Sequence, residues 1–113
     1  MTVQEIIKRD DVDLDVTVTD LDGVAINLTN QTVIFTMKNN PTDPDSSAVI
    51  QKRITSHTVP SQGKTRVVLT HDDTDIPAKY YFYDLQVISS VGKVSSIPKG
   101  QIRVIQDITV EAS

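Results

Sequence analysis

The stretch Ile76-Pro77-Ala78-Lys79-Tyr80-Tyr81-Phe82-Tyr83-Asp84-Leu85-Gln86-Val87 contains four of the five aromatic residues of this chain. Aromatic and β-branched side chains are typical of strands because they pack well on the pleated, half-buried surface of a sheet. Each aromatic ring also buries more area than an aliphatic side chain does. The stretch therefore predicts a central strand at the heart of the core, and the polar residues 70–75 before it predict the corner that leads into that strand.

This strand should have two different faces, because successive side chains point to opposite sides of a sheet. The predicted core-facing residues are Tyr81, Tyr83, Leu85 and Val87. The hydroxyl groups of the two buried tyrosines would need a polar partner or a place at the rim. Tyr80 and Phe82 then lie on the outer face, where a neighbouring loop could cover them, or another protein or a sugar could bind them. Sugar-binding β-modules favour tryptophan, which this chain lacks.

The rest of the chain is dominated by alternation of apolar and polar residues, the pattern of a half-buried strand. Predicted strands cover residues 12–18, 31–38, 64–70 and 101–110, with a less regular one at 48–54 that Lys52 interrupts. Asp20-Leu21-Asp22-Gly23 predicts a turn, and Thr70 could begin a single helical turn over residues 72–76. Seven or eight short strands without an amphipathic helix predict an all-β, two-sheet, immunoglobulin-like β-sandwich.

Length and charge limit the possible functions. The 113 residues predict one domain, residues 1–113, in which residues 1–9 form an N-terminal docking arm or an edge strand. The net charge is −4 and the lysines and arginines are scattered, which disfavours nucleic acid and anionic membranes as partners. Without cysteine there are no disulfides, no thiolate nucleophile and no cysteine-based zinc site.

No motif for catalysis, metal binding or cofactor binding stands out. The acidic turn does not fit a calcium loop, because alignment on Gly23 places Val18 and Thr29 at the first and twelfth ligand positions. His57 and His71 both lie in loop-like sequence, where a solvated imidazole is the simplest interpretation. We therefore predict a protein that is not an enzyme and has no catalytic residue, metal site or cofactor.

Several stretches in their order along the chain resemble a family of small phage virion domains, the immunoglobulin-like N-terminal domain of baseplate upper proteins and related tail or head accessory proteins. The stretches begin at Arg9-Asp10-Asp11 and Leu14-Asp15-Val16-Thr17-Val18, continue with Asp20-Leu21-Asp22-Gly23 and Thr32-Val33-Ile34-Phe35-Thr36-Met37, and end with Tyr81-Phe82-Tyr83-Asp84-Leu85-Gln86-Val87 and Gly100-Gln101-Ile102-Arg103-Val104. The chain differs from the family at three positions, with Arg9 and Lys79 where glycine is common and Ala25 where proline is usual.

The resemblance implies a non-enzymatic structural protein of a phage or prophage particle, in the tail, the baseplate or as a head decoration. It implies contacts with other virion proteins, such as major capsid, tail or baseplate subunits, and a homo-oligomer within the particle. The alternative is a carbohydrate- or receptor-binding β-sandwich module for attachment to a host surface. The N-terminus lacks the pattern of a signal peptide, so we expect synthesis in the host cytoplasm and a place in the virion.

Three segments are candidates for the contact surface. Val3, Ile6 and Ile7 precede the first regular strand and could add an edge strand to a neighbouring subunit. The loop at residues 39–47, which begins with Asn39 and Asn40, is the longest turn-rich stretch. Tyr80 and Phe82 on the outer face of the aromatic strand complete the candidate set.

Overall fold

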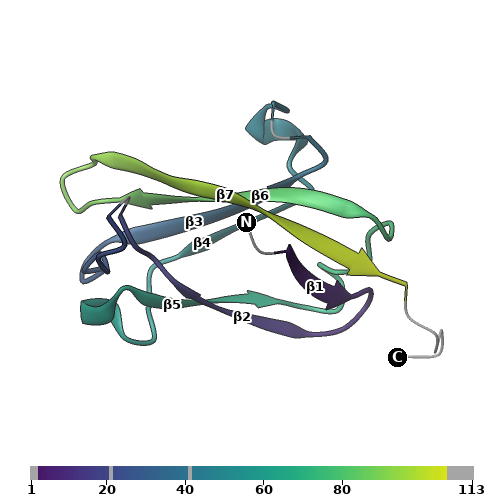
Figure 1. Ribbon diagram of the computed structural model, residues 1–113, viewed down its shortest axis with the longest axis horizontal. Helices are drawn as coiled ribbons and strands as arrows, with labels where there is room; N and C mark the ends of the chain where they lie inside the picture. The colour runs from purple at the N-terminus through teal and green to yellow at the C-terminus, as the bar shows by residue number, and fades with distance from the viewer. Residues whose placement is uncertain (1–2, 21, 41, 107–113) are drawn as a thin grey trace.

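The computed structural model describes residues 3–20, 22–40 and 42–106, without the side chains of residues 3, 4, 45 and 95–99. It contains the strands β1 (Val3–Ile7), β2 (Val12–Thr17), β3 (Thr32–Lys38), β4 (Ile50–Ile54), β5 (Lys64–Leu69), β6 (Tyr80–Ile88) and β7 (Val94–Ile105), and two 3-10 turns, η1 (Asp45–Ser47) and η2 (Pro60–Gln62). A five-stranded sheet in the order β1-β7-β6-β3-β4 faces a two-stranded sheet of β2 and β5 (Figure 1). The predicted all-β, two-sheet sandwich is confirmed.

The strand order is that of an immunoglobulin domain. The run β7-β6-β3-β4 corresponds to strands G, F, C and C′ of the variable type, and β2-β5 corresponds to the pair B and E. All pairs are antiparallel except β1 and β7, which run in parallel with Val3 opposite Gln101 and Ile7 opposite Ile105. The first strand therefore lies at the edge of the larger sheet.

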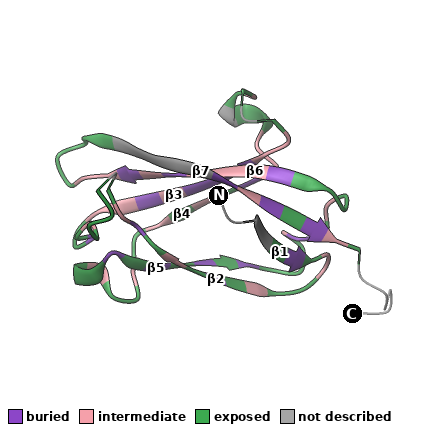
Figure 2. Cartoon of the chain, viewed as in Figure 1, coloured by how far each residue is buried: buried purple, intermediate pink, exposed green. Residues whose placement is uncertain are grey.

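The core fills the space between the two sheets, and the aromatic strand contributes as its alternation predicts (Figure 2). Tyr81, Leu85 and Val87 of β6 are buried, while Tyr83 is half-buried and packs on Phe35 with 5.7 Å between the ring centroids. The predicted inward faces of β2, β3 and β5 also point into the core. Their buried members are Leu14, Val33, Phe35, Met37, Thr65, Val67 and Leu69.

The corner before β6 is held by the hydroxyl of Tyr81. Its Oη donates a hydrogen bond to the carbonyl oxygen of Pro77 at 2.6 Å, four residues upstream. The position at the start of the F-like strand and the bond back to the preceding backbone match the tyrosine corner of immunoglobulin-like domains. This bond is the polar partner that the sequence requires for a fully buried phenol.

Lys52 interrupts the pattern of β4 because it forms an inward-facing ion pair. It lies on the same side of the strand as Ile50 and Ile54, and its Nζ is 2.8 Å from Oδ2 of Asp73. Asp73 also accepts a hydrogen bond from the Thr70 N–H and returns one from its own N–H to the Thr70 hydroxyl. This reciprocal pair is a capping box, and it closes the single helical turn predicted after Thr70.

Two strand boundaries differ from the prediction. β4 begins at Ile50, two residues after the expected start at residue 48, and follows the 3-10 turn η1. β7 begins at Val94, well before the expected start at residue 101, because residues 94–97 pair with β6. The expected residues 108 and 110 of the last strand lie outside the described residues.

The turn between β1 and β2 contains a residue with a positive φ. Arg9 has a φ of 68°, in the left-handed region that favours glycine. An arginine is therefore strained at this position, where glycine would not be.

Candidate protein-contact surface

The outer face of the five-stranded sheet brings together candidate residues that are far apart in the sequence. In the sheet register Glu5 lies beside Arg103, and Arg103 lies beside Tyr80. Two residues further along the strands, Gln101 lies beside Phe82, and Phe82 lies beside Lys38. We call the outward side chains of Glu5, Ile7, Lys38, Tyr80, Phe82 and Arg103 the outer face.

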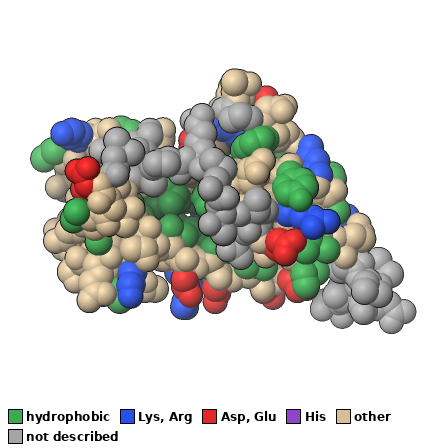
Figure 3. Space-filling view, in the orientation of Figure 1, with side chains coloured by type: hydrophobic (Ala, Val, Ile, Leu, Met, Phe, Trp, Pro, Cys, Tyr) green, Lys and Arg blue, Asp and Glu red, His purple; other side chains and the backbone are tan. Residues whose placement is uncertain are grey.

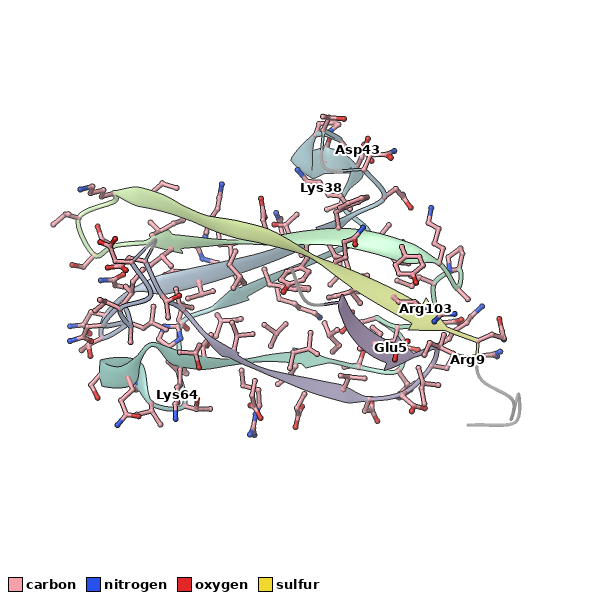
Figure 4. The ribbon with its side chains drawn as sticks, viewed as in Figure 1. Glu5, Arg9, Lys38, Asp43, Lys64 and Arg103 are labelled. Atoms are coloured by element: carbon pink, nitrogen blue, oxygen red, sulfur yellow. The ribbon has the colours of Figure 1, made fainter. Side chains whose placement is uncertain are left out.

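Tyr80 is the most exposed aromatic residue of this face. Its side chain is 52% exposed, and the Arg103 guanidinium lies over its ring at 5.6 Å from the centroid, within cation–π range. Nη1 of Arg103 is also 3.3 Å from Oε2 of Glu5 on β1 (Figure 4). The three side chains form a row of contacts across the neighbouring strands β1, β7 and β6.

Phe82 is half-buried, and its partners in the sheet register are Lys38 on β3 and Gln101 on β7. Lys38 beside it donates from Nζ to the carbonyl oxygen of Asp43 at 2.8 Å (Figure 4). Asp43 in turn accepts a hydrogen bond from the Asn40 N–H through Oδ2 at 3.2 Å. The loop after β3 is therefore tied to the end of the sheet next to Phe82, with Asn39 half-buried and Asn40 exposed.

The N-terminal candidates are part of the fold and do not form a free arm. Residues 3–7 pair with β7, so Val3 contributes backbone to an edge strand of this same chain, and its side chain is not described. Ile6 is only 3% exposed and packs in the core, which removes it from the contact surface. Ile7 points to the other side of the strand, is 45% exposed, and belongs to the outer face.

A second surface feature, which the sequence pattern did not indicate, is a hollow between β2 and the larger sheet. Its volume is about 280 Å³, and it is lined by Asp13, Leu14, Asp15, Val16, Thr17, Phe35, Tyr83 and Ile102. Figure 3 shows a hollow in this side of the molecule with hydrophobic side chains at its floor. The sequence pattern could not indicate this hollow, because its lining residues come from four strands that meet only in the folded protein.

The two histidines have different roles. His57 is half-buried and bridges two segments, with Nδ1 at 2.9 Å from the Thr65 hydroxyl and Nε2 at 2.7 Å from the Gln31 carbonyl oxygen. A carbonyl only accepts hydrogen bonds, so Nε2 carries the proton. This arrangement occupies both ring nitrogens, and the imidazole is a structural link where we expected a solvated side chain.

His71 lies at the surface beside Asp11. Nδ1 of His71 is 3.1 Å from Oδ1 of Asp11, and the His71 backbone N–H donates to the same oxygen at 2.7 Å. The side-chain hydrogen bond to Asp11 raises the pKa of His71 above its ordinary value, and the backbone hydrogen bond from His71 lowers the pKa of Asp11. The pair links the β1–β2 turn to the corner before β6.

The described part of the chain has neither a metal-binding cluster nor a membrane-spanning helix. Within it, no group of three or more histidine or acidic side chains is arranged to hold a metal ion. The described residues also contain no helix with the length and apolar character needed to span a membrane. The acidic turn instead stabilises itself, since Oδ1 of Asp20 accepts hydrogen bonds from the N–H groups of Asp22 and Val24.

Comparison with known proteins yields a likeness of fold. No protein-family model matches the chain, and no curated protein matches it. Among solved structures, it is similar to the soluble domain of PmoD from Methylocystis sp. (strain Rockwell), with a TM-score of 0.53 and 10% sequence identity over 90% of this chain and 78% of that one. The likeness extends to the fold alone.

Proposed function

We propose that this chain is a non-enzymatic structural protein of a phage or prophage particle, placed in the tail, the baseplate or the head decoration. It works through protein–protein contacts in a symmetric assembly. The sequence resemblance to small virion domains supplies the particle context. The observation that carries the contact role is the outer face, where Ile7, Tyr80 and Phe82 share one side of the sheet with Arg103, which is paired with Glu5.

The composition of this face suits a protein partner. Tyrosine and arginine, together with tryptophan, are enriched among the residues that dominate binding energy at protein interfaces. Tyr80 and Ile7 are 52% and 45% exposed, so both retain apolar area that a partner can cover. The pair of Glu5 and Arg103 lies between them and offers charged groups that set the register of the contact.

A symmetric particle repeats one such contact around an axis. The same surface on every copy then meets a fixed surface of the neighbouring subunit, so a single face is enough to place many copies. The neighbouring subunits are other virion proteins or further copies of this chain.

The test is incorporation into purified particles. Mass spectrometry and imaging of particles should find the chain at a copy number set by the particle symmetry, and Tyr80→Ala should reduce that number at least about tenfold. The matched control is Val91→Ala, because Val91 is 88% exposed but lies in the β6–β7 connection. Particles that never contain the chain would contradict the proposal.

The alternative function is carbohydrate or receptor binding, and the observation that favours it is the exposed ring of Tyr80. A sugar platform needs a free aromatic face, however, and Arg103 covers one face of this ring. A glycan array separates the two functions. Binding that is lost on Tyr80→Ala would support the sugar module, and an array without binding would remove it.

A further inference from the structure

The hollow beside β2 coincides with an unpaired edge of the smaller sheet. Within the described residues β2 pairs only with β5, so its other edge has no strand beside it (Figure 1). The hollow lies under this edge, and its lining includes the buried side chains of Phe35 and Ile102 and the half-buried ring of Tyr83. An apolar space and a free strand edge therefore occur at the same place.

The hydrogen bonds around β2 show which backbone groups face that edge. Lys64 and Val59 exchange two backbone hydrogen bonds, so the backbone groups of Lys64 point away from β2 and from Thr17 opposite it. Val18 donates its N–H toward the β5 side, to Gly63. In an antiparallel pair the direction alternates along the strand. The N–H and C=O groups of Asp13, Asp15 and Thr17 consequently point to the open edge.

Charge specifies the strand that would fit there. Asp13 and Asp15 are exposed side chains of the same edge strand, and an added strand would place its own outward side chains about 5 Å from theirs. Arg66 already pairs with Asp15 at 2.8 Å, whereas the residue opposite Asp13 is Val68, which carries no charge. A neighbouring strand with lysine or arginine between its apolar residues complements this edge.

We infer that β2 accepts a β-strand from a partner protein. Apolar side chains at alternate positions of that strand fill the hollow, and its basic side chains lie beside Asp13 and Asp15. The backbone of the added strand bonds to the outward groups of Asp13, Asp15 and Thr17, which is recognition by strand addition. The inference deepens the assembly role proposed above and depends on it only for the source of the strand.

The chain's own last segment fits this edge less well. Residues 107–113 alternate apolar and polar residues, but the polar positions include Asp107 and Glu111. Carboxylates directly opposite carboxylates are destabilising across a strand pair. A basic partner strand is therefore favoured over the last segment of this chain or of a second copy of it.

The first experiment measures amide hydrogen exchange by NMR in the isolated protein. The N–H groups of Leu14 and Val16, which face β5, should exchange slowly, and those of Asp13, Asp15 and Thr17 should exchange fast. Slow exchange at Asp13 and Asp15 in the free protein would mean that the edge is already covered, and it would overturn the inference.

The second experiment adds a short synthetic peptide that alternates valine with lysine. We expect binding that slows exchange at Asp13, Asp15 and Thr17 at least about tenfold, and little binding of the same peptide with glutamate in place of lysine. Equal binding of the glutamate peptide, or protection confined to other strands, would overturn the inference.

Substitutions at Thr17 make the test specific. Thr17→Pro removes an N–H that none of the described strands β1–β7 uses, so it should weaken peptide binding about tenfold with little effect on folding. Thr17→Val keeps the N–H and should bind as the original chain does. If Thr17→Pro fails to fold, a peptide N-methylated on its edge-facing amides replaces it, and equal binding of that peptide would contradict strand addition. None of these results depends on whether the chain is found in particles.

Discussion

Tyr81 shows how one side chain can fix a turn of the fold. Its ring is fully buried beneath the corner between β5 and β6, and burial raises the pKa of its phenol. The hydroxyl donates its hydrogen bond to Pro77, so the corner is attached to the core through a single atom. Removal of that atom leaves the packing of the ring in place and tests the bond alone.

We expect Tyr81→Phe to lower the free energy of unfolding by about 1 kcal/mol, the net value of a typical buried hydrogen bond. Chemical denaturation followed by circular dichroism measures the change. The control is Tyr83→Phe, in which the half-buried ring next to Phe35 is retained. Equal losses in the two variants would contradict a special role of the Tyr81 hydroxyl.

The pair of His71 and Asp11 predicts a pH dependence. The raised pKa of His71 makes its contribution to stability complete below 6.5, the ordinary value, and lost as the pH rises through the raised pKa. The lowered pKa of Asp11 makes its contribution present above 3.8 and lost as the pH falls through the lowered pKa. The pair thus stabilises the protein most between these two ordinary values.

An NMR titration of the His71 ring checks this. The midpoint should lie above 6.5 in the original chain and fall toward that value in Asp11→Asn, because the variant removes the charge and the hydrogen bond that favour the imidazolium. Asp72→Asn is the control, since Asp72 acts on the ring only through a weaker charge effect. An unchanged midpoint in Asp11→Asn would disprove the coupling.

At the scale of the elements, the inward ion pair of Lys52 and Asp73 connects β4 to the turn before β6. Burial on its own raises the pKa of Asp73, but the hydrogen bonds from Lys52 and Thr70 outweigh it and the pKa is lowered. Asp73→Asn should destabilise the protein by about 1–3 kcal/mol, because Lys52 then keeps its charge without a partner. Thermal unfolding at neutral pH measures this loss.

The control for this prediction is Asp72→Asn at a neighbouring position that is 93% exposed, where we expect little change. A second check uses pH. The difference between the original chain and Asp73→Asn should shrink as the pH falls through the lowered pKa of Asp73, since a protonated carboxyl no longer holds Lys52 by charge. A constant difference at all pH values would contradict the ion pair.

The strand alternation in the sequence was enough to predict which faces of β2, β3, β5 and β6 enter the core. The first half of β7 was not predictable in this way. Residues 94–100 include serines, a proline and a glycine, which have low strand propensity, and they are extended because they pair with β6. Gly100 illustrates the reason, since a Cβ there would lie 2.5 Å from the Tyr83 ring, a contact that no local pattern reveals.

At the scale of the whole molecule, the packing of β1 distinguishes an N-terminal docking arm from a strand that belongs to the fold. Ile6 and Ile7 are neighbours with opposite orientations, 3% and 45% exposed. Ile6→Ala should cost about 2–5 kcal/mol because it leaves a cavity between the sheets, and Ile7→Ala should cost much less. Denaturant titrations of the two variants measure the difference, and similar small effects would show that β1 does not pack as described.

The candidate contact surface was predictable only in part. The alternation of β6 placed Tyr80 and Phe82 on the outer side, and the structure places them there. The proximity of Tyr80 to Glu5 and Ile7 depends on the parallel pairing of β1 with β7, which joins residues 98 positions apart, as in the contact of Arg103 with Glu5. Neither spacing nor composition contains that information, and the same is true of the hollow under β2.

The parallel pair of β1 and β7 also has a consequence for biosynthesis. β1 leaves the ribosome before its partner at residues 101–105, which emerges only after the intervening strands β2–β6. Until then the apolar side chain of Ile6 has no sheet to complete, and closure must await the synthesis of β7. A polypeptide that stops before β7 would expose this strand to proteases and chaperones, so the pairing of β1 with β7 distinguishes chains that contain the whole sandwich from chains that stop within it.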